Sequence, residues 1–417
     1  MHENETQQQR VLLVAADLGE YDIEVSLNEL EELTKTAGGI VIGKITQKRS
    51  DLDIATCLGS GRIEEAAEFC KASDIDLVIF DHELKASQIR NIEKICDCPV
   101  IDRTMLILDI FAQRARTSEG RLQVELAQQK YLLPRLSGRG TSLSRLGGGI
   151  GTRGPGETKL EIDKRHIRRR IQGLEEQLEQ LTQRRNLIRT KRKKDGVVTA
   201  AIVGYTNVGK STLLNAMTDA GVLAEDKLFA TLDPTSRAII LPSGRSVMLI
   251  DTVGLIRRLP HHLVEAFKST LEEAANADVI LNVCDATSEE MDEQISVTRE
   301  LLVSLNAGDI PVITLLNKCD KLDEIPLTFN ENTVLISAKT GYGFDNLLNI
   351  IEKTLVPTHK RLTLVIPYSV GGLLNEIRNS GKVFSEDFTN DGTMVDALVE
   401  VKIISKVQDY IVKEEKI

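Results

Sequence analysis

Glycines, a lysine and a serine stand at the spacing of a phosphate-binding loop in one stretch of the sequence. Residues Gly204–Ser211 read G-Y-T-N-V-G-K-S, which matches G-x-x-x-x-G-K-[ST], and they follow an apolar run typical of a buried strand, Val197–Gly204. In such a loop backbone N–H groups surround the α- and β-phosphates, Lys210 neutralises the β- and γ-oxygens, and Ser211 offers a hydroxyl to Mg²⁺. The expected nucleotide contacts are Gly204, Tyr205, Thr206, Asn207, Val208, Gly209, Lys210, Ser211 and Thr212.

A second motif supplies groups that are expected near the γ-phosphate. The apolar run Val247–Ile250 predicts a strand that ends in D-T-V-G. An aspartate at this place can hold Mg²⁺, usually through water, and the glycine N–H can reach the γ-phosphate. We therefore expect four more contacts, from Asp251, Thr252, Val253 and Gly254.

The segment between these two motifs carries a threonine that can respond to the γ-phosphate. Thr231 is the predicted Mg²⁺ ligand of a first switch, with Phe229 and Ala230 beside the nucleotide, and Thr235 is the alternative ligand. The predicted catalytic residues are Lys210, Thr231 and Gly254, and the predicted metal ligands are Ser211, Thr231 and Asp251.

Two further motifs indicate which base the site accepts. N-K-C-D, residues 317–320, follows the apolar run Val312–Leu316, and S-A-K, residues 337–339, ends the run Thr333–Ser337. The Asp320 carboxylate can accept hydrogen bonds from guanine N1–H and N2–H₂, a donor pair that adenine lacks. Four motifs in this order, each after a strand, predict a GTP-binding core. The expected base contacts are Asn317, Lys318, Asp320, Ser337, Ala338 and Lys339.

Four regions must position these residues. Residues 1–113 alternate short β-branched runs with amphipathic helical stretches, which predicts a mostly parallel α/β sheet. Residues 114–195 predict a long, coiled-coil-like helical hairpin, residues 196–356 a Ras-like P-loop GTPase domain, and residues 357–417 a small α+β domain. The expected fold class is therefore a multidomain α/β protein.

The hairpin is expected to have two arms and a glycine-rich tip. The first arm, about Glu119–Leu133, ends at Pro134, and the second shows an apolar seam that runs to Ile188. The tip, Ser137–Glu157, holds eight glycines, and residues 135–194 carry a net charge of +11 inside a chain of net charge −10. We expect the tip to order against a phosphate-rich surface, with a flexible linker as the alternative. Its candidate phosphate contacts are Arg139, Arg145 and Arg153.

The core resembles the Era–Obg–TrmE group of translation-related GTPases, where F-x-T-L is a usual first-switch pattern. The stretch R-L-G-G-G-I-G-T-R-G-P-G-E-T-K-L-E, residues 145–161, resembles one family of that group, HflX, and the resemblance runs from Val11 into the C-terminal region. It implies a GTPase that binds the large ribosomal subunit (50S) and its rRNA, with the tip arginines near the peptidyl-transferase centre. It further implies splitting of stalled 70S ribosomes, relief of large-subunit antibiotics, and ATP binding by the N-terminal region, for which the sequence shows no motif.

The second switch departs from common GTPase patterns at two positions. Leu255 follows D-T-V-G where many GTPases have a glutamine that orients the attacking water. Leucine cannot hydrogen-bond water, so we expect slow intrinsic turnover with marked stimulation by the 50S subunit. Residues 256–260 read I-R-R-L-P, whereas the family pattern I-R-D-L-P has an aspartate at the position of Arg258. Arg257 or Arg258 could act as an arginine finger or be a solvated charge.

The composition argues against a membrane-spanning, secreted or disulfide-rich protein. No apolar run approaches the ~18 residues that span a bilayer, no charged-then-apolar leader opens the chain, and six scattered cysteines are too few for a disulfide framework. We therefore expect a cytoplasmic monomer with reduced thiols, no membrane insertion and no DNA partner. Two alternatives to a ribosome-splitting GTPase stay open. One is a GTP-dependent switch or ribosome-assembly factor that binds rRNA or protein without splitting ribosomes, and the other is a P-loop phosphotransferase or ATPase.

Overall fold

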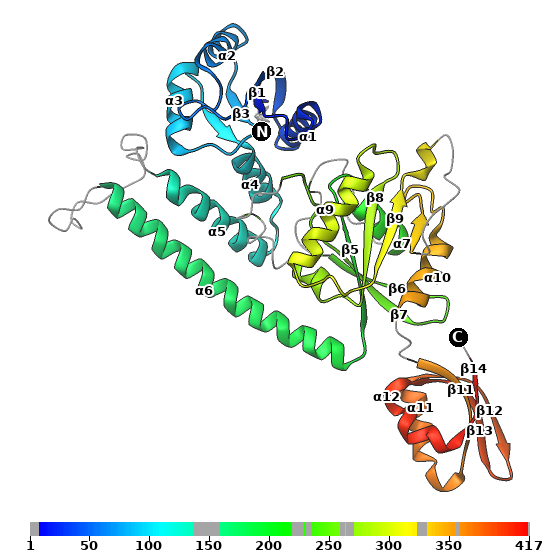
Figure 1. The fold of residues 1–417 in the computed structure, drawn as a ribbon. Helices are drawn as coiled ribbons and strands as arrows, with labels where there is room; N and C mark the ends of the chain where they lie inside the picture. Colours follow the sequence, from blue (N-terminus) through cyan, green and yellow to red (C-terminus); the bar gives the residue numbers. More distant parts are fainter. Residues whose placement is uncertain are drawn as a thin grey trace, which may run out of the picture. The chain divides into compact units, whose positions relative to one another are not determined.

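The computed structural model describes residues 8–136, 159–218, 229, 235–258, 263, 271–322, 332–355 and 359–415 (Figure 1). The chain divides into two compact units, Met1–Leu348 and Asn349–Ile417. The first unit holds two largely parallel sheets and a helical hairpin, and the second holds a small antiparallel sheet. The predicted multidomain α/β class is confirmed, while the predicted domain boundaries stay predictions.

The N-terminal sheet has four parallel strands in the order β2-β1-β3-β4. Six consecutive residues of β1 are buried, which is why this strand reads as a continuous apolar run. Aspartates begin two of the helices: Asp22 accepts hydrogen bonds from the first turn of α1, and Asp102 accepts from the Met105 N–H of α4. The elements are β1 (Arg10–Asp17), α1 (Ile23–Thr36), β2 (Ile40–Lys48), α2 (Ser60–Ala72), β3 (Leu77–Phe80), α3 (Ala86–Cys96), β4 (Val100–Asp102) and α4 (Arg103–Arg114).

Helices α5 (Ser118–Arg135) and α6 (Lys159–Lys194) lie side by side and form the predicted hairpin (Figure 1). Two details of the prediction are wrong. Pro134 lies inside α5, because a proline in the last turn disturbs few hydrogen bonds before the helix ends. Ile188 is 54% exposed and therefore outside any buried seam. Helix α5 is half as long as α6, and Glu119 in its first turn already pairs with Arg185 at 2.7 Å. Ile188 follows Arg185 in α6 and therefore lies beyond the start of α5.

The second sheet of this unit has six strands in the order β10-β9-β8-β5-β7-β6, and only β6 runs antiparallel to its neighbour. Since the parallel strands point the same way, the loops after β5, β7, β9 and β10 come out at one edge. These loops carry the four predicted motifs. The elements are β5 (Val198–Gly204), α7 (Lys210–Thr218), β6 (Thr235–Ile240), β7 (Ser246–Asp251), β8 (Val279–Asp285), α9 (Met291–Ser304), β9 (Val312–Asn317), η2 (Cys319–Lys321), β10 (Thr333–Leu335) and α10 (Phe344–Thr354).

The second unit is the small α+β fold that the sequence predicts. Its four antiparallel strands follow the order β12-β13-β11-β14, and side chains of α11 and α12 complete an apolar core with β11 and β13. Its elements are β11 (His359–Ile366), η3 (Tyr368–Val370), α11 (Gly372–Ser380), β12 (Lys382–Thr389), β13 (Gly392–Glu400), α12 (Val401–Val407), η4 (Gln408–Tyr410) and β14 (Ile411–Glu415).

Among the described residues, no helix has both the length and the hydropathy needed to cross a bilayer.

Candidate functional site

Lys210 is fixed by the loop to which it belongs. It begins α7, it is 7% exposed, and its ammonium donates to the carbonyls of Gly204 and Tyr205 at 3.0 and 2.6 Å. Burial lowers the pKa of Lys210 to about 8, and the nearby charge of Asp251 acts in the opposite direction. Because this cation is held in place and desolvated, it would attract an anion far more strongly than a lysine in water does.

The backbone of the phosphate loop presents several N–H groups to one side. Within the described part of the chain, the N–H groups of Asn207, Val208 and Gly209 have no acceptor. Asn207 and Gly209 have positive φ angles of 61° and 96°, a conformation in which successive N–H groups form an anion-binding concavity. A Cβ on Gly209 would lie 2.4 Å from the amide nitrogen of Asn317, so contact and backbone conformation both require glycine there.

Asn317 joins the phosphate loop to the S-A-K loop. It ends β9 and is 2% exposed. Its amide nitrogen donates to the Val208 carbonyl at 2.7 Å, and its amide oxygen accepts from the Ala338 N–H at 2.8 Å. Both hydrogen bonds are buried, so this side chain holds the two loops at a fixed separation, which is the bracing geometry that the motif predicts.

Asp320 and Ser337 meet where the base motifs converge. The Ser337 hydroxyl donates to Asp320 at 2.6 Å, and this hydrogen bond lowers the pKa of the exposed Asp320 carboxyl, which is therefore ionised at neutral pH. Lys318 has a positive φ of 67°, and its ammonium pairs with Asp285 at 2.7 Å. The sequence motifs do not indicate a role for Asp285. The feature that could have indicated one is its position at the end of the apolar strand β8.

Ser211 and Asp251 bring two oxygen groups together beside the phosphate loop. The Ser211 hydroxyl donates to the buried Asp251 carboxylate at 2.9 Å. A hydroxyl and a carboxylate suit Mg²⁺, which usually keeps water and substrate phosphate oxygens as its other ligands. Among the described residues there is no cluster of three or more metal-ligating side chains, so the remaining ligands would have to come from nucleotide and water. The residues present therefore fit this ion.

The D-T-V-G segment lies directly against the phosphate loop. The Leu255 N–H donates to the Gly204 carbonyl at 3.0 Å, and the Leu255 carbonyl accepts from the Thr206 N–H at 2.8 Å. A Cβ on Gly254 would lie 2.7 Å from the Thr206 methyl and 3.1 Å from the Lys210 ammonium, so glycine is needed for this approach. The side chain of Leu255 is 5% exposed and packs into the protein, so it offers no group that could orient water.

Some predicted contacts direct their side chains elsewhere. Thr252 is fully buried and its hydroxyl donates to the Ile202 carbonyl of β5 at 2.7 Å. Phe229 packs edge-on against Phe111 of α4, with ring centroids 4.5 Å apart. Other predicted residues lie outside the described part of the chain, namely Ala230, Thr231, Arg139, Arg145 and Arg153.

Three family models match successive parts of the chain. They are described as GTP-binding GTPase N-terminal, over residues 24–112, GTP-binding GTPase Middle Region, over residues 114–192, and 50S ribosome-binding GTPase, over residues 199–318. The last model covers the phosphate loop and the D-T-V-G motif, and it ends at Lys318, inside N-K-C-D. Fold and motifs together define a P-loop GTPase.

Individual relatives match over nearly the whole chain. The GTPase HflX of Caldanaerobacter subterraneus subsp. tengcongensis is 52% identical over 412 residues, 99% of this chain and 96% of the relative. The GTPase HflX of Escherichia coli is 43% identical over 374 residues, 88% of each chain. The crystal structure of a GTP-binding protein from Sulfolobus solfataricus is 24% identical with a TM-score of 0.46, over 83% of this chain and 98% of that one. The chain belongs to the HflX family of GTPases, and GTP is its substrate.

Proposed function

We propose that the chain is a ribosome-associated, Mg²⁺-dependent GTPase that binds the 50S subunit through rRNA near the peptidyl-transferase centre and splits 70S ribosomes into subunits. The observation that carries this proposal is the basic hairpin. Its long arm, α6, has 36 residues and is therefore about 54 Å long at 1.5 Å per residue. The +11 segment that contains this arm suits a phosphate-rich surface, because neutralised phosphates release their counterions on binding. The 50S ribosome-binding description of the matching family model supports the same partner.

In the proposed site each motif has one task. Lys210 binds the β- and γ-phosphates, and Ser211 and Asp251 hold Mg²⁺ directly or through water, with Thr231 as a further ligand. The Gly254 N–H binds the γ-phosphate, and Asp320 selects guanine. The short distances from Lys210 to the loop carbonyls and from Ser211 to Asp251 support the roles of these three residues.

Hydrolysis by this site should depend on a partner. Since the Leu255 side chain is buried and apolar, the attacking water needs a group from elsewhere. We propose that binding to the 50S subunit supplies or orders that group, so that turnover is slow in isolation. By resemblance, the same cycle at the subunit would relieve antibiotics that act there.

The experiment that tests this proposal combines hydrolysis with sedimentation. Steady-state GTP hydrolysis by the full chain is measured with and without purified 50S subunits, and 70S ribosomes are run on sucrose gradients with the protein and a non-hydrolysable GTP analogue. We expect strong stimulation and loss of the 70S peak, both weakening as salt is raised. Stimulation with an intact 70S peak would favour a GTP-dependent switch over a splitting factor. Maximal turnover without ribosomes would contradict the proposed dependence.

A further inference from the structure

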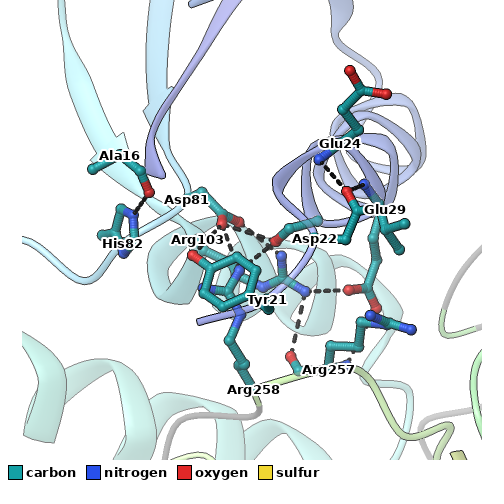
Figure 2. A network of polar contacts seen from close by, with 12 residues as sticks. Ala16, Tyr21, Asp22, Glu24, Glu29, Asp81, His82, Arg103, Arg257 and Arg258 are labelled. Carbon is teal, nitrogen blue, oxygen red and sulfur yellow. Dashed lines mark hydrogen bonds and ion pairs between the residues drawn. The ribbon is translucent and has the colours of Figure 1, made fainter. Parts of the chain in front are cut away.

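A buried ionic network connects the second switch to the N-terminal sheet (Figure 2). Asp81, which directly follows β3, has a fully buried side chain and accepts from Arg103 at 2.9 Å and from the Ser26 hydroxyl at 2.8 Å. Arg258 of the second switch also donates to both Asp81 and Ser26. Burial alone would raise the pKa of Asp81, but Arg103 and Arg258 together hold it below its usual value. Asp81 therefore carries a buried negative charge that two arginines share.

The backbone of Arg257 is held by the same network. Its N–H donates to Glu29 of α1 at 3.3 Å, and its carbonyl accepts from Arg103 at 3.3 Å. Arg103 in turn forms an ion pair with Glu29 (Figure 2). The Arg257 side chain pairs with Glu290, the residue directly before α9. Since both arginines of this segment are engaged in ion pairs, neither is placed as a free arginine finger.

The conformation of Arg258 shows that these contacts determine the path of the chain. Arg258 has a φ of 47°, in the left-handed region that is unfavourable for a residue with a Cβ. Its guanidinium lies 3.9 Å from the centroid of the Tyr21 ring, in addition to its contact with Asp81. Strained backbone of this kind persists when surrounding contacts impose it, and it occurs often in switch regions.

The segment between the network and the nucleotide site is short and is fixed at both ends. Three residues separate Gly254 from Arg258, so the two are at most about 14 Å apart along the chain. The backbone of Leu255 is hydrogen-bonded to the phosphate loop, and Arg257 and Arg258 are bonded to the N-terminal sheet and α1. The Gly254 N–H has no acceptor among the described residues, and a Cβ on Gly254 would lie 3.1 Å from the Lys210 ammonium. A donor in this position is available to an incoming phosphate.

We propose that Arg258 and Asp81 are positioning residues for the GTPase reaction, which hold the second switch so that the Gly254 N–H stays where a γ-phosphate binds. The inference rests on the proposed nucleotide site. A loop that is already in its bound position loses less freedom on binding, so the pair favours triphosphate binding. GDP has no γ-phosphate, and its affinity is therefore independent of this pair. The network thus makes discrimination between GTP and GDP depend on the N-terminal domain.

The test compares two nucleotides in one variant. Arg258→Gln removes the cation from a side chain that is about one-third exposed, which leaves Asp81 paired with Arg103. Dissociation constants are measured for GDP and for a non-hydrolysable GTP analogue with the full chain. We expect the affinity for the analogue to fall by about 5–30-fold, in the range of ordinary coupling between sites, and that for GDP to change less than twofold. Arg378→Gln, which removes an arginine from an exposed ion pair of the second unit, is the matched control and should change neither.

Two further variants separate positioning from a general loss of structure. Arg258→Lys keeps the charge but loses the paired hydrogen bonds, so it should recover part of the analogue affinity. Arg258→Gln combined with Asp81→Asn should weaken analogue binding little more than Asp81→Asn alone, because that single change already removes the contact with Arg258. An unchanged ratio of the two affinities in Arg258→Gln, or tighter analogue binding, would overturn the inference. Failure of the unmodified protein to bind GDP would instead overturn the proposed nucleotide site.

Discussion

Replacement of Asn317 by alanine is the change from which the structure predicts the most specific effect. The side chain is 2% exposed and makes two hydrogen bonds, of 2.7 Å to the Val208 carbonyl and 2.8 Å from the Ala338 N–H. Alanine cannot replace either bond, and both backbone groups stay buried. Leaving a buried polar group unpaired costs about 1–3 kcal/mol, so the total is about 2–4 kcal/mol after partial relaxation.

This cost divides between folding and nucleotide binding, because the phosphate loop and the S-A-K loop can each relax in the free protein. If half appears in binding, the affinity for GDP falls by about 5–30-fold, since every 1.4 kcal/mol is tenfold. The affinity for a GTP analogue should fall by the same factor, because Asn317 supports the loops and not the γ-phosphate. Thermal unfolding of the protein should also shift to lower temperature.

The assay is equilibrium binding of fluorescent GDP and of a fluorescent GTP analogue, with thermal unfolding measured on the same samples. Asn375→Ala serves as the control, because among the described residues that exposed amide makes one weak contact, of 3.5 Å from Arg378. Equal loss for both nucleotides supports the bracing role. Unchanged affinities, or a loss confined to the GTP analogue, would refute the argument that Asn317 fixes the two loops.

Three further changes test other parts of the site. Asp320→Asn replaces the acceptor for guanine N1–H with an amide and should shift preference to xanthosine nucleotides, measured as the ratio of GDP to XDP affinity; an unchanged ratio would contradict the base assignment. Because burial lowers the pKa of Lys210 to about 8 and a bound phosphate favours the charged lysine, GDP binding should take up about half a proton at pH 8 and almost none at pH 6.5. Calorimetry in buffers of different ionisation enthalpy measures that uptake. The lowered pKa of Asp81 contributes stability at neutral pH that disappears as the pH falls through that pKa. Arg258→Gln should therefore begin to unfold at a higher pH in acid titration followed by circular dichroism, and coincident curves would contradict the ion pair.

The nucleotide motifs were predictable because each one is local. The sequence G-Y-T-N-V-G-K-S contains its own strand boundary, its glycines and its lysine, and the other motifs likewise follow apolar runs that end at the same edge of the sheet. Parallel strands then bring the loops together without further information. The same locality explains the errors. Whether Pro134 ends α5, or Ile188 joins a buried seam, depends on where the partner helix starts, and hydrophobic spacing in one segment does not contain that information.

The contacts of Arg258 could not be predicted from the sequence, because no local sequence pattern indicates them. Asp81 and Arg258 are 177 residues apart, and Asp81 by itself resembles any aspartate that follows an apolar strand. In the structure the Asp81 side chain is fully buried, and a buried carboxylate requires compensating charge. Arg103 and Arg258 supply that charge from two different parts of the chain. An aspartate at position 258 would place a second carboxylate against Asp81 in this arrangement. The arginine that appears in the sequence as a departure from the pattern is, in the structure, the charge that this contact requires.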